Sequence, residues 1–374
     1  MKILHVTKKY PGIIGGDSTV VVNLEKYQKA LGHEVSILTS NCDEINSGDV
    51  KRFGLKILPN EIDKINFKRL ISLFLLFFSS FYYLSKLKPD LVNSHSPEIG
   101  FIMSLPCRIC GIPLVNTCHG VTFPNKHLSF GKRKTEEFLL KYGYFKKIIT
   151  VSKNSLKDFE KIRIKNVKYM PNGICLEQFA GKENSKKQEL LGKNNRTIFL
   201  FVGRLEKSKG LEYLLKAAGE LKKFEKNFEI LLIGNGNEEQ FLKQLAIKLE
   251  LQNYVKFLGK KKQEEVVNYY SFSDVFILPS LYEGFPIALL EAWASGLPVI
   301  TTDAAGLQSI CQDKENALIV PSCDSSSMAS AMLTLSKDNI LREKLIKNGK
   351  KLVAERYNWA TITLKIIKLY KECI

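Results

Sequence analysis

Residues 201–210 read Phe-Val-Gly-Arg-Leu-Glu-Lys-Ser-Lys-Gly, and this stretch decides the fold. An apolar run from Ile198 to Val202 predicts a buried strand that ends in the glycine turn at Gly203. A helical pattern begins directly after the loop. A buried strand, a glycine turn and a helix in this order are typical of parallel α/β proteins, so the rest of the chain is expected to continue the alternation.

The first half of the chain follows the same alternation. Short apolar runs predict strands, and longer amphipathic patterns between them predict helices. The predicted strands are 3–7, 35–39, 55–58, 91–94, 114–117, 148–151 and 167–170, and the predicted helices are 18–31, 67–86, 98–110, 133–143 and 153–162. The fold class is therefore α/β, with a parallel, doubly wound sheet.

A polar stretch at residues 173–196 is predicted to be a linker, after which the alternation starts again. The predicted strands of this second series are 198–202, 228–233, 254–258, 275–278, 298–301 and 317–320, and the predicted helices are 210–222, 237–249, 263–271, 286–295 and 325–336. With 374 residues, the chain is long enough for two domains. We expect one domain at 1–172, completed by a C-terminal helix at 357–374, and a second at 197–356.

Charged residues gather at the ends of two predicted strands of the second series. Arg204 and Lys209 lie in the loop quoted above, and Glu283 and Glu291 follow the strand at 275–278. Phosphate oxygens suit the guanidinium fork of Arg and the point charge of Lys, and a helix N-terminus adds partial positive charge. A loop for a diphosphate beside carboxylates for hydroxyl groups indicates a nucleotide-sugar site.

The composition sets limits on partners and compartment. The net charge is +18, and residues 1–180 carry 27 Lys and Arg against 15 Asp and Glu. Such an excess attracts anionic lipid, nucleic acid or phosphorylated substrates, although a solvated lysine-rich surface explains it equally well. The eight cysteines are scattered, which argues against a disulfide framework. Cys107 and Cys110 form a lone C-x-x-C, which we interpret as two ordinary helix residues.

An apolar stretch at residues 70–84 is open to two interpretations. It reads Leu-Ile-Ser-Leu-Phe-Leu-Leu-Phe-Phe-Ser-Ser-Phe-Tyr-Tyr-Leu, and Lys68, Arg69, Lys86 and Lys88 flank it. The stretch is shorter than the ~20 apolar residues that span a bilayer. We interpret it first as a core helix, and second as a helix that touches a membrane surface.

The ordered set of motifs resembles the retaining, nucleotide-sugar-dependent glycosyltransferases of family four. That family has the GT-B fold, with two facing Rossmann-like domains. The resemblance runs nearly from end to end, and each segment is short. The segments are Gly15-Gly16, Leu31-Gly-His-Glu-Val35, Thr117-Cys-His-Gly120, Met170-Pro-Asn-Gly-Ile174, Val202-Gly-Arg-Leu-Glu-Lys-Ser-Lys-Gly210, Ser280-Leu-Tyr-Glu-Gly-Phe-Pro-Ile-Ala-Leu-Leu-Glu291 and Ala294-Ser-Gly-Leu-Pro-Val299.

The resemblance implies a role for each matching residue. The implied catalytic set comprises Arg204 and Lys209 at the leaving diphosphate, Glu283 at the transferred sugar, and His119 near the reacting carbon. Glu291 is implied to bind the ribose hydroxyls. The remaining donor-binding positions are Gly16, Gly203, Gly234, Gly284, Phe285, Pro286 and Leu290, where glycine lets the backbone approach the ligand.

Two segments depart from the family pattern, and two further observations argue against a dinucleotide cofactor and a bound metal. Cys175 stands where an acidic residue is usual, and Ala305-Gly-Leu-Gln308 replaces a G-G-x-P-E stretch. Gly234-Asn-Gly236 lacks the third glycine of a dinucleotide fingerprint, so we interpret it as a tight turn near the nucleotide base. The sequence has no D-x-D pair, so neither a metal nor another cofactor is expected.

The sequence therefore predicts a metal-independent, retaining glycosyltransferase of the hexosyltransferase type. Its expected substrates are a UDP- or GDP-sugar donor and a hydroxyl of a lipid-linked or oligosaccharide acceptor. We expect a cytoplasmic protein with peripheral contact to an anionic membrane at its inner face, and no nucleic-acid partner. The alternatives are a catalytically weak sugar-nucleotide-binding partner protein, a nucleotide-sugar epimerase or a phosphorylase on the same scaffold, and an NAD oxidoreductase.

Overall fold

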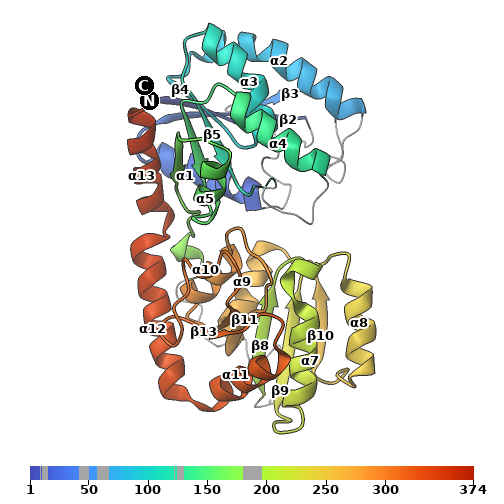
Figure 1. The fold of residues 1–374 in the computed structure, drawn as a ribbon. Helices are drawn as coiled ribbons and strands as arrows, with labels where there is room; N and C mark the ends of the chain where they lie inside the picture. Colours follow the sequence, from blue (N-terminus) through green and yellow to red (C-terminus); the bar gives the residue numbers. More distant parts are fainter. Residues whose placement is uncertain are drawn as a thin grey trace. The chain divides into compact units, whose positions relative to one another are not determined.

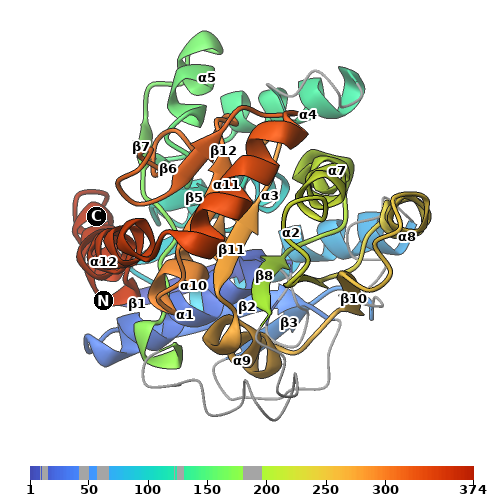
Figure 2. The same ribbon diagram turned by 90° about the horizontal axis from the view of Figure 1, so that it is seen from below.

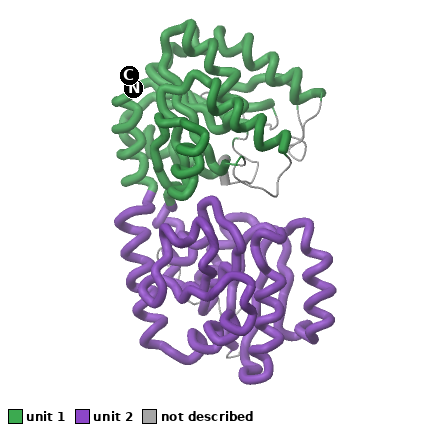
Figure 3. Tube along the Cα trace, in the orientation of Figure 1, with its two compact units in different colours: residues 1–173, 359–374 green, residues 174–358 purple. Residues whose placement is uncertain are grey.

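The structure is a computed structural model that describes residues 1–8, 10, 16–41, 50–56, 67–121, 123, 130–179 and 196–374. The chain forms two compact units (Figure 3). The first contains residues 1–173 and 359–374, and the second contains residues 174–358. Much of the stretch expected as a linker, 180–195, lies outside the described residues.

The first unit, whose helices are labelled in Figure 1, is built on a parallel sheet with the strand order β3-β2-β1-β4-β5-β6-β7. Its strands are β1 (Lys2–Thr7), β2 (Glu34–Ser40), β3 (Val50–Phe53), β4 (Leu91–Ser94), β5 (Leu114–Cys118), β6 (Lys147–Thr150) and β7 (Val167–Tyr169). Its helices are α1 (Gly16–Ala30), α2 (Phe67–Leu87), α3 (Pro97–Ile109), α4 (Phe130–Tyr142), α5 (Ser155–Lys161) and α13 (Trp359–Lys371).

The second unit has a parallel sheet with the order β10-β9-β8-β11-β12-β13. Its strands are β8 (Thr197–Val202), β9 (Phe228–Ile233), β10 (Val255–Gly259), β11 (Val275–Leu278), β12 (Val299–Thr302) and β13 (Leu318–Val320). Its helices are α7 (Leu211–Leu221), α8 (Glu239–Lys248), α9 (Gln263–Phe272), α10 (Ile287–Ala294), α11 (Ser325–Lys337) and α12 (Asn339–Arg356). Figure 2 shows α7 and α11 on one side of this sheet and α9 and α10 on the other.

Both sheets are doubly wound, as the sequence predicts. Most strands are rich in apolar residues because helices cover both faces of a parallel sheet; every residue of β9, for example, is buried. In each unit the strand order reverses beside the first strand, between β1 and β4 and between β8 and β11. Open parallel sheets bind ligands at the carboxyl ends of the strands that flank such a reversal. The topology therefore predicts that ligands bind at the loops after these four strands.

One predicted strand, at residues 55–58, lies partly outside the described residues. Residues 55 and 56 are not part of a strand, residues 57 and 58 are not described, and the third strand of the first sheet is β3 (Val50–Phe53). Residues 51 and 52 are Lys and Arg, so the strand lacks the apolar run that marks the others. It can be this polar because it lies at the edge of the sheet, where it pairs only with β2.

The chain returns to the first unit between residues 358 and 359. Helix α12 ends at Arg356, and α13 begins at Trp359 and packs against α1. Gly173 lies against the Trp359 ring, where a β-carbon would come within 2.7 Å of a ring atom. In the second unit, Ile174 donates its backbone N–H to the Tyr357 carbonyl oxygen at 2.7 Å. The forward and the returning chain therefore lie side by side.

Helix α2 is a surface helix, so its interpretation as a core helix is wrong. Its buried residues form one narrow stripe: Arg69, Ser72, Leu76, Ser80 and Leu84. Large apolar side chains cover the rest, and Phe74 and Phe78 are 64% and 56% exposed. Among the described helices, only α2 is long and apolar enough to cross a membrane. Core helices of soluble proteins can have the same length and composition.

The described cysteines are all free thiols, and they divide by burial. Cys107 on α3, Cys118 on β5 and Cys311 lie in the two cores, and Cys110 and Cys323 are exposed. Burial raises the pKa of Cys107 to about 12, with a smaller contribution from Cys110. Burial also raises the pKa of Cys118 and of Cys311. Cys107 and Cys110 are thus ordinary residues at the end of a helix, as expected from the sequence.

Candidate functional site

The loops that follow β8 and β11 are joined to each other. Leu281 donates its backbone N–H to the Ser208 carbonyl oxygen at 2.8 Å. Gly210 has φ +63°, and a β-carbon there would lie 2.1 Å from the Pro279 carbonyl oxygen, so only glycine allows this approach. Because β8 and β11 are neighbouring strands at the reversal of the sheet, the two loops form one continuous surface at the strand ends.

Lys209 and Glu283 meet at this surface. The Lys209 ammonium lies 2.6 Å from Glu283 Oε1, and Ser280 donates its hydroxyl to the same oxygen at 2.6 Å. The Glu283 side chain is only 6% exposed, so its charge is largely removed from water and depends on these two donors. The sequence predicted both charged residues, and the structure brings them into direct contact.

The segment that departs from the family pattern supports Glu283 from behind. Glu283 donates its backbone N–H to the Ala305 carbonyl oxygen at 3.0 Å. Gly306 has φ +99°, and a β-carbon there would lie 1.9 Å from the Glu283 carbonyl oxygen. The substituted stretch therefore keeps a glycine where the backbone of Glu283 requires one.

Arg204 lies in the same loop as Lys209 but in a different environment. Its side chain is 75% exposed, and the guanidinium lies 2.7 Å from Glu206 Oε1. Gly203 and Gly234 pack directly on each other at the base of this loop: Gly234 has φ +137°, and a β-carbon would lie 1.8 Å from the Gly203 carbonyl oxygen. The two glycines allow the ends of strands β8 and β9 to pack closely together. Packing alone therefore accounts for glycine at these two positions.

Glu291 lies within helix α10 and is held by two donors from helix α9. Gln263 donates to Glu291 Oε1 and Tyr270 donates its hydroxyl to Oε2, both at 2.9 Å. Burial raises the pKa of the Glu291 carboxyl, and the two hydrogen bonds oppose that shift. Burial also raises the pKa of Tyr270, which stays protonated as a donor. The carboxylate is therefore fixed in orientation before any ligand arrives.

The other donor-binding candidates of the second unit differ in accessibility. Gly284 has open space where a β-carbon would stand. Phe285 is half-buried, with its ring 6.0 Å from that of Tyr357, and Pro286 is buried directly before α10. Leu290 is fully buried in the core, so its side chain supports the loop from below.

The two candidates of the first unit are His119 and Gly16. Gly16 begins α1, and its neighbour Gly15 lies outside the described residues. His119 follows β5, and its Nε2 lies 3.0 Å from Nδ1 of His95, which follows β4. His95 Nε2 in turn lies 2.8 Å from His5 Nδ1 on β1.

Sequence reasoning missed the partners of the site residues. Gln263, Tyr270 and Ser280 bind the two glutamates; Gln263 and Tyr270 lie outside the quoted segments, and Ser280 begins one of them without an implied role. His5 was missed as well, because a histidine inside an apolar strand gives no signal of its partner. His95 does carry a signal, namely its place directly after the predicted strand at 91–94, but unlike His119 it lies in none of the segments that resemble the family.

The part of the chain that the structure describes contains no group of three or more His, Cys, Asp and Glu side chains that could hold a metal ion.

Comparisons with known proteins identify the family and the fold to which this chain belongs. Residues 14–178 match the model "Glycosyltransferase Family 4", and residues 182–352 match "Glycosyl transferases group 1". The chain is 30% identical, over 87% of its length and 84% of the relative's, to the UDP-Gal:alpha-D-GlcNAc-diphosphoundecaprenol alpha-1,3-galactosyltransferase of Escherichia coli. The chain therefore belongs to the family-four, group 1 glycosyltransferases.

Two further comparisons extend over whole chains. The uncharacterized glycosyltransferase MJ1607 of Methanocaldococcus jannaschii is 29% identical, over 99% of this chain and 98% of the relative. Anabaena Alr3699/HepE, solved with UDP and glucose, superposes with a TM-score of 0.81 at 18% identity, with full coverage of both chains. The fold is GT-B, as the resemblance implied.

Proposed function

We propose that this glycosyltransferase moves a sugar from a nucleoside-diphosphate sugar, with UDP or GDP as the nucleotide, to a hydroxyl of a lipid-linked acceptor, and retains the anomeric configuration. The observation that carries the proposal is the joined pair of loops with Lys209 and Glu283 in contact at the strand ends. The relative from Escherichia coli supports the substrates by its name, which contains UDP-Gal and a diphosphoundecaprenol acceptor.

The proposed reaction breaks the bond between the anomeric carbon and the β-phosphate oxygen, and the electron pair leaves with the phosphate. Arg204 and Lys209 stabilise the negative charge that develops there; one such donor is typically worth ~3 kcal/mol of barrier. The acceptor oxygen bonds to the same face of the anomeric carbon, and its proton passes to the departing phosphate. Lys209 and Arg204 take the place that a metal ion would have, so we propose a metal-independent reaction.

Glu283 and Glu291 bind the donor in this proposal. Glu283 accepts hydrogen bonds from the transferred sugar, and its contact with Lys209 links sugar recognition to the leaving group. Glu291 accepts from the ribose hydroxyls, since its carboxylate is already oriented by Gln263 and Tyr270. Gly284, next to Glu283, has open space where a β-carbon would stand, so a ligand can approach its backbone closely.

The first test is the thermal stability of the purified protein with UDP, GDP and ADP and with their common sugar conjugates. A nucleotide present at ~100 times its dissociation constant should add ~2.7 kcal/mol to the free energy of unfolding. We expect one nucleotide to stabilise the wild type and not Glu291→Ala. If none of these nucleotides stabilises the wild type, the proposed donor site is refuted.

The second test is turnover with the donor found in this way. We expect Lys209→Ala and Arg204→Ala each to lower kcat about a hundredfold. Lys207→Ala is the matched control, because Lys207 is an exposed lysine of the same loop with no proposed role. Near-wild-type turnover of both test variants would refute the assignment.

Two further measurements test the type of reaction. Loss of turnover on addition of EDTA would refute metal independence. The anomeric configuration of the product, determined from NMR coupling constants, tests retention.

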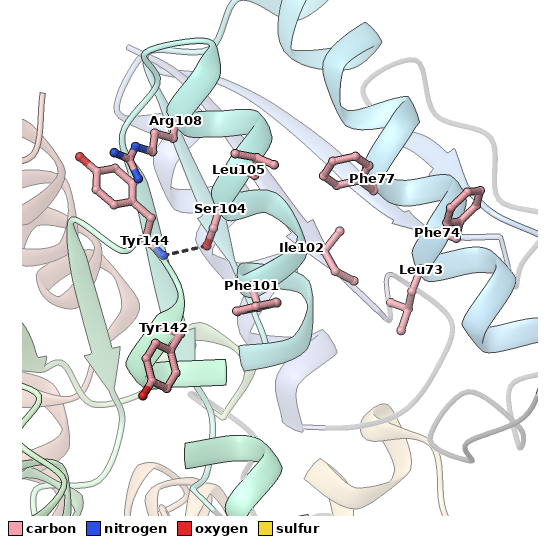
Figure 4. Close-up of a pocket in the computed structure, with 10 residues that line it drawn as sticks. All are labelled: Leu73, Phe74, Phe77, Phe101, Ile102, Ser104, Leu105, Arg108, Tyr142 and Tyr144. Carbon is pink, nitrogen blue, oxygen red and sulfur yellow. Dashed lines mark hydrogen bonds between the residues drawn. The ribbon is translucent and has the colours of Figure 1, made fainter. Parts of the chain in front are cut away.

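We further propose that the first unit binds the membrane that carries the acceptor. An apolar groove of 530 Å³ lies between α2, α3 and α4 (Figure 4). Aromatic and aliphatic side chains line it, and at one end Arg108 lies over the Tyr144 ring at 5.0 Å. Such a surface suits an acyl or isoprenoid chain, and the exposed lysines Lys68, Lys86 and Lys88 suit anionic headgroups.

Flotation with vesicles that contain anionic lipid tests the membrane contact. We expect the wild type to float at low salt, and the double variant Phe74→Ser/Phe78→Ser to remain in solution. Phe224→Ser is the matched control, since Phe224 is a 75% exposed phenylalanine of the second unit. A wild type that never floats would count against the proposal, and so would equal flotation of all three proteins.

A catalytically weak sugar-nucleotide-binding protein remains the competing function. Nucleotide binding with no transfer to any lipid-linked acceptor, and with no epimerised donor by NMR, would favour it.

A further inference from the structure

Three histidines cross the first sheet at its carboxyl edge in a single hydrogen-bonded line. His5 lies on β1, His95 directly after β4 and His119 directly after β5, and these three strands are neighbours. His5 Nδ1 lies 2.8 Å from His95 Nε2, and His95 Nδ1 lies 3.0 Å from His119 Nε2. The planes of the His95 and His119 rings differ by only 9°, which suits in-plane bonds between ring nitrogens.

The inner part of this line is closed to water and is uncharged. His5 is fully buried and His95 is 5% exposed. Burial lowers the pKa of His5 to about 4, and burial together with the neighbouring His5 and His119 lowers the pKa of His95. Both rings are therefore neutral at pH 7, so each has one N–H donor and one acceptor nitrogen.

Gln28 on α1 sets the direction of the line. The amide is assigned with its carbonyl oxygen Oε1 2.8 Å from His5 Nε2; a carbonyl oxygen only accepts, so in this orientation His5 donates from Nε2. The other nitrogen of His5, Nδ1, must then accept, and His95 Nε2–H is its donor. His95 Nδ1 accepts in the same way, and His119 Nε2–H is its donor.

We propose that His5 and His95 are positioning residues that hold the His119 ring in one orientation, in the tautomer with hydrogen on Nε2. This inference rests on the proposed function, in which His119 lies near the reacting carbon.

Nitrogen-15 NMR of the histidine rings tests the tautomer directly. In uniformly labelled wild-type protein at pH 7, we expect His119, His95 and His5 each to show a protonated Nε2 and an unprotonated Nδ1. The signals are assigned with single variants of each histidine. A protonated Nδ1 on His119 would overturn the proposal. Because this spectrum needs no substrate, it gives the same answer if the proposed transfer activity fails.

Two variants of His95 separate positioning from simple packing. The Asn side chain places an amide oxygen near the position of His95 Nδ1, so His95→Asn can still accept from His119 Nε2. His95→Leu fills the space without an acceptor. We expect His119 to keep its tautomer in His95→Asn and to populate both tautomers in His95→Leu. His33→Gln is a control outside the line and should leave the His119 signals unchanged.

Kinetics with the identified donor complete the test. His95→Leu is expected to lower kcat about tenfold or more, the scale found when a group that orients a histidine is removed, with substantial recovery in His95→Asn. A purely structural role predicts equal losses in both variants and one unchanged His119 tautomer, and that result would refute positioning. If His95→Leu fails to fold, the wild-type spectrum and His95→Asn still decide the question.

Discussion

At the scale of single residues, two glycines near Glu283 have opposite requirements. A β-carbon at Gly306 would overlap the Glu283 carbonyl oxygen at 1.9 Å, whereas Gly284 has open space. We expect Gly306→Ala to lower the free energy of unfolding by about 1–3 kcal/mol or more, and Gly284→Ala to leave it nearly unchanged. Urea denaturation of both variants measures this difference. Equal stability of the two would show that the loop adjusts without strain.

The buried His5 predicts acid sensitivity. Its pKa in the folded protein is about 4, against 6.5 for the free side chain. Below pH 6.5 the unfolded chain gains a proton that the folded protein does not bind, so stability falls as the pH decreases toward 4 and rises toward pH 7. At pH 5 the loss amounts to about 2 kcal/mol from His5 alone. His95 acts in the same direction, because its pKa is lowered as well.

Denaturation of wild type and His5→Leu at several pH values tests this sign. The variant has less stability overall because Gln28 and His95 lose a partner, yet its stability should depend less on pH between 7 and 5. The same pH dependence in both proteins would show that His5 does not titrate in this way.

The site shows which residues a sequence can identify. Lys209, Arg204 and Glu283 follow predicted strands as charged residues in glycine loops, and this pattern is local, so it could be found. Tyr270 and Gln263 bind Glu291 from another helix, and Ser280 is a common residue beside a turn. Their roles depend on which side chains the fold brings together, and no local pattern contains that information.

Among the secondary-structure elements, helix α2 shows that an apolar residue is not always a buried one. Leu76 is fully buried in its narrow stripe, whereas Phe78 is more than half exposed, although both are large apolar residues of the same helix. We expect Leu76→Ala to lower the free energy of unfolding by about 2–5 kcal/mol and Phe78→Ala to leave it almost unchanged. Thermal denaturation in the absence of lipid measures both. A comparable loss in Phe78→Ala would show that the exposed face contributes to the core.

Most elements could be predicted because their burial pattern is simple. Strands such as β11 and β13 are apolar at every position, as is typical of a parallel sheet covered on both faces. The edge strand β3 has no such run, and the apolar α2 has an excess of large side chains that the core does not use. Both errors arise because composition alone does not tell which face of an element another element covers.

At the scale of the whole molecule, the C-terminal helix completes the first unit. Helix α13 buries Trp359, Ile362, Ile366 and Tyr370, and Asn93 on β4 donates to the Tyr370 hydroxyl at 2.6 Å. Tyr370→Phe leaves Asn93 with an unsatisfied buried amide and should cost about 1–3 kcal/mol. Calorimetry checks the value, and an unchanged unfolding temperature would contradict it. Sequence alone indicated a last helix for the first domain, but not this polar contact.

The division of the cysteines by burial makes the protein suitable for site-directed spectroscopy. Thiolate is the reactive form, so the high pKa and burial of Cys107, Cys118 and Cys311 protect them from alkylating reagents at neutral pH. Cys110 in the first unit and Cys323 in the second are exposed. With Cys42 replaced by Ser, a pair of spin labels would attach at these two positions. Their separation, measured by pulsed electron resonance with and without a nucleotide, would report directly on movement between the units.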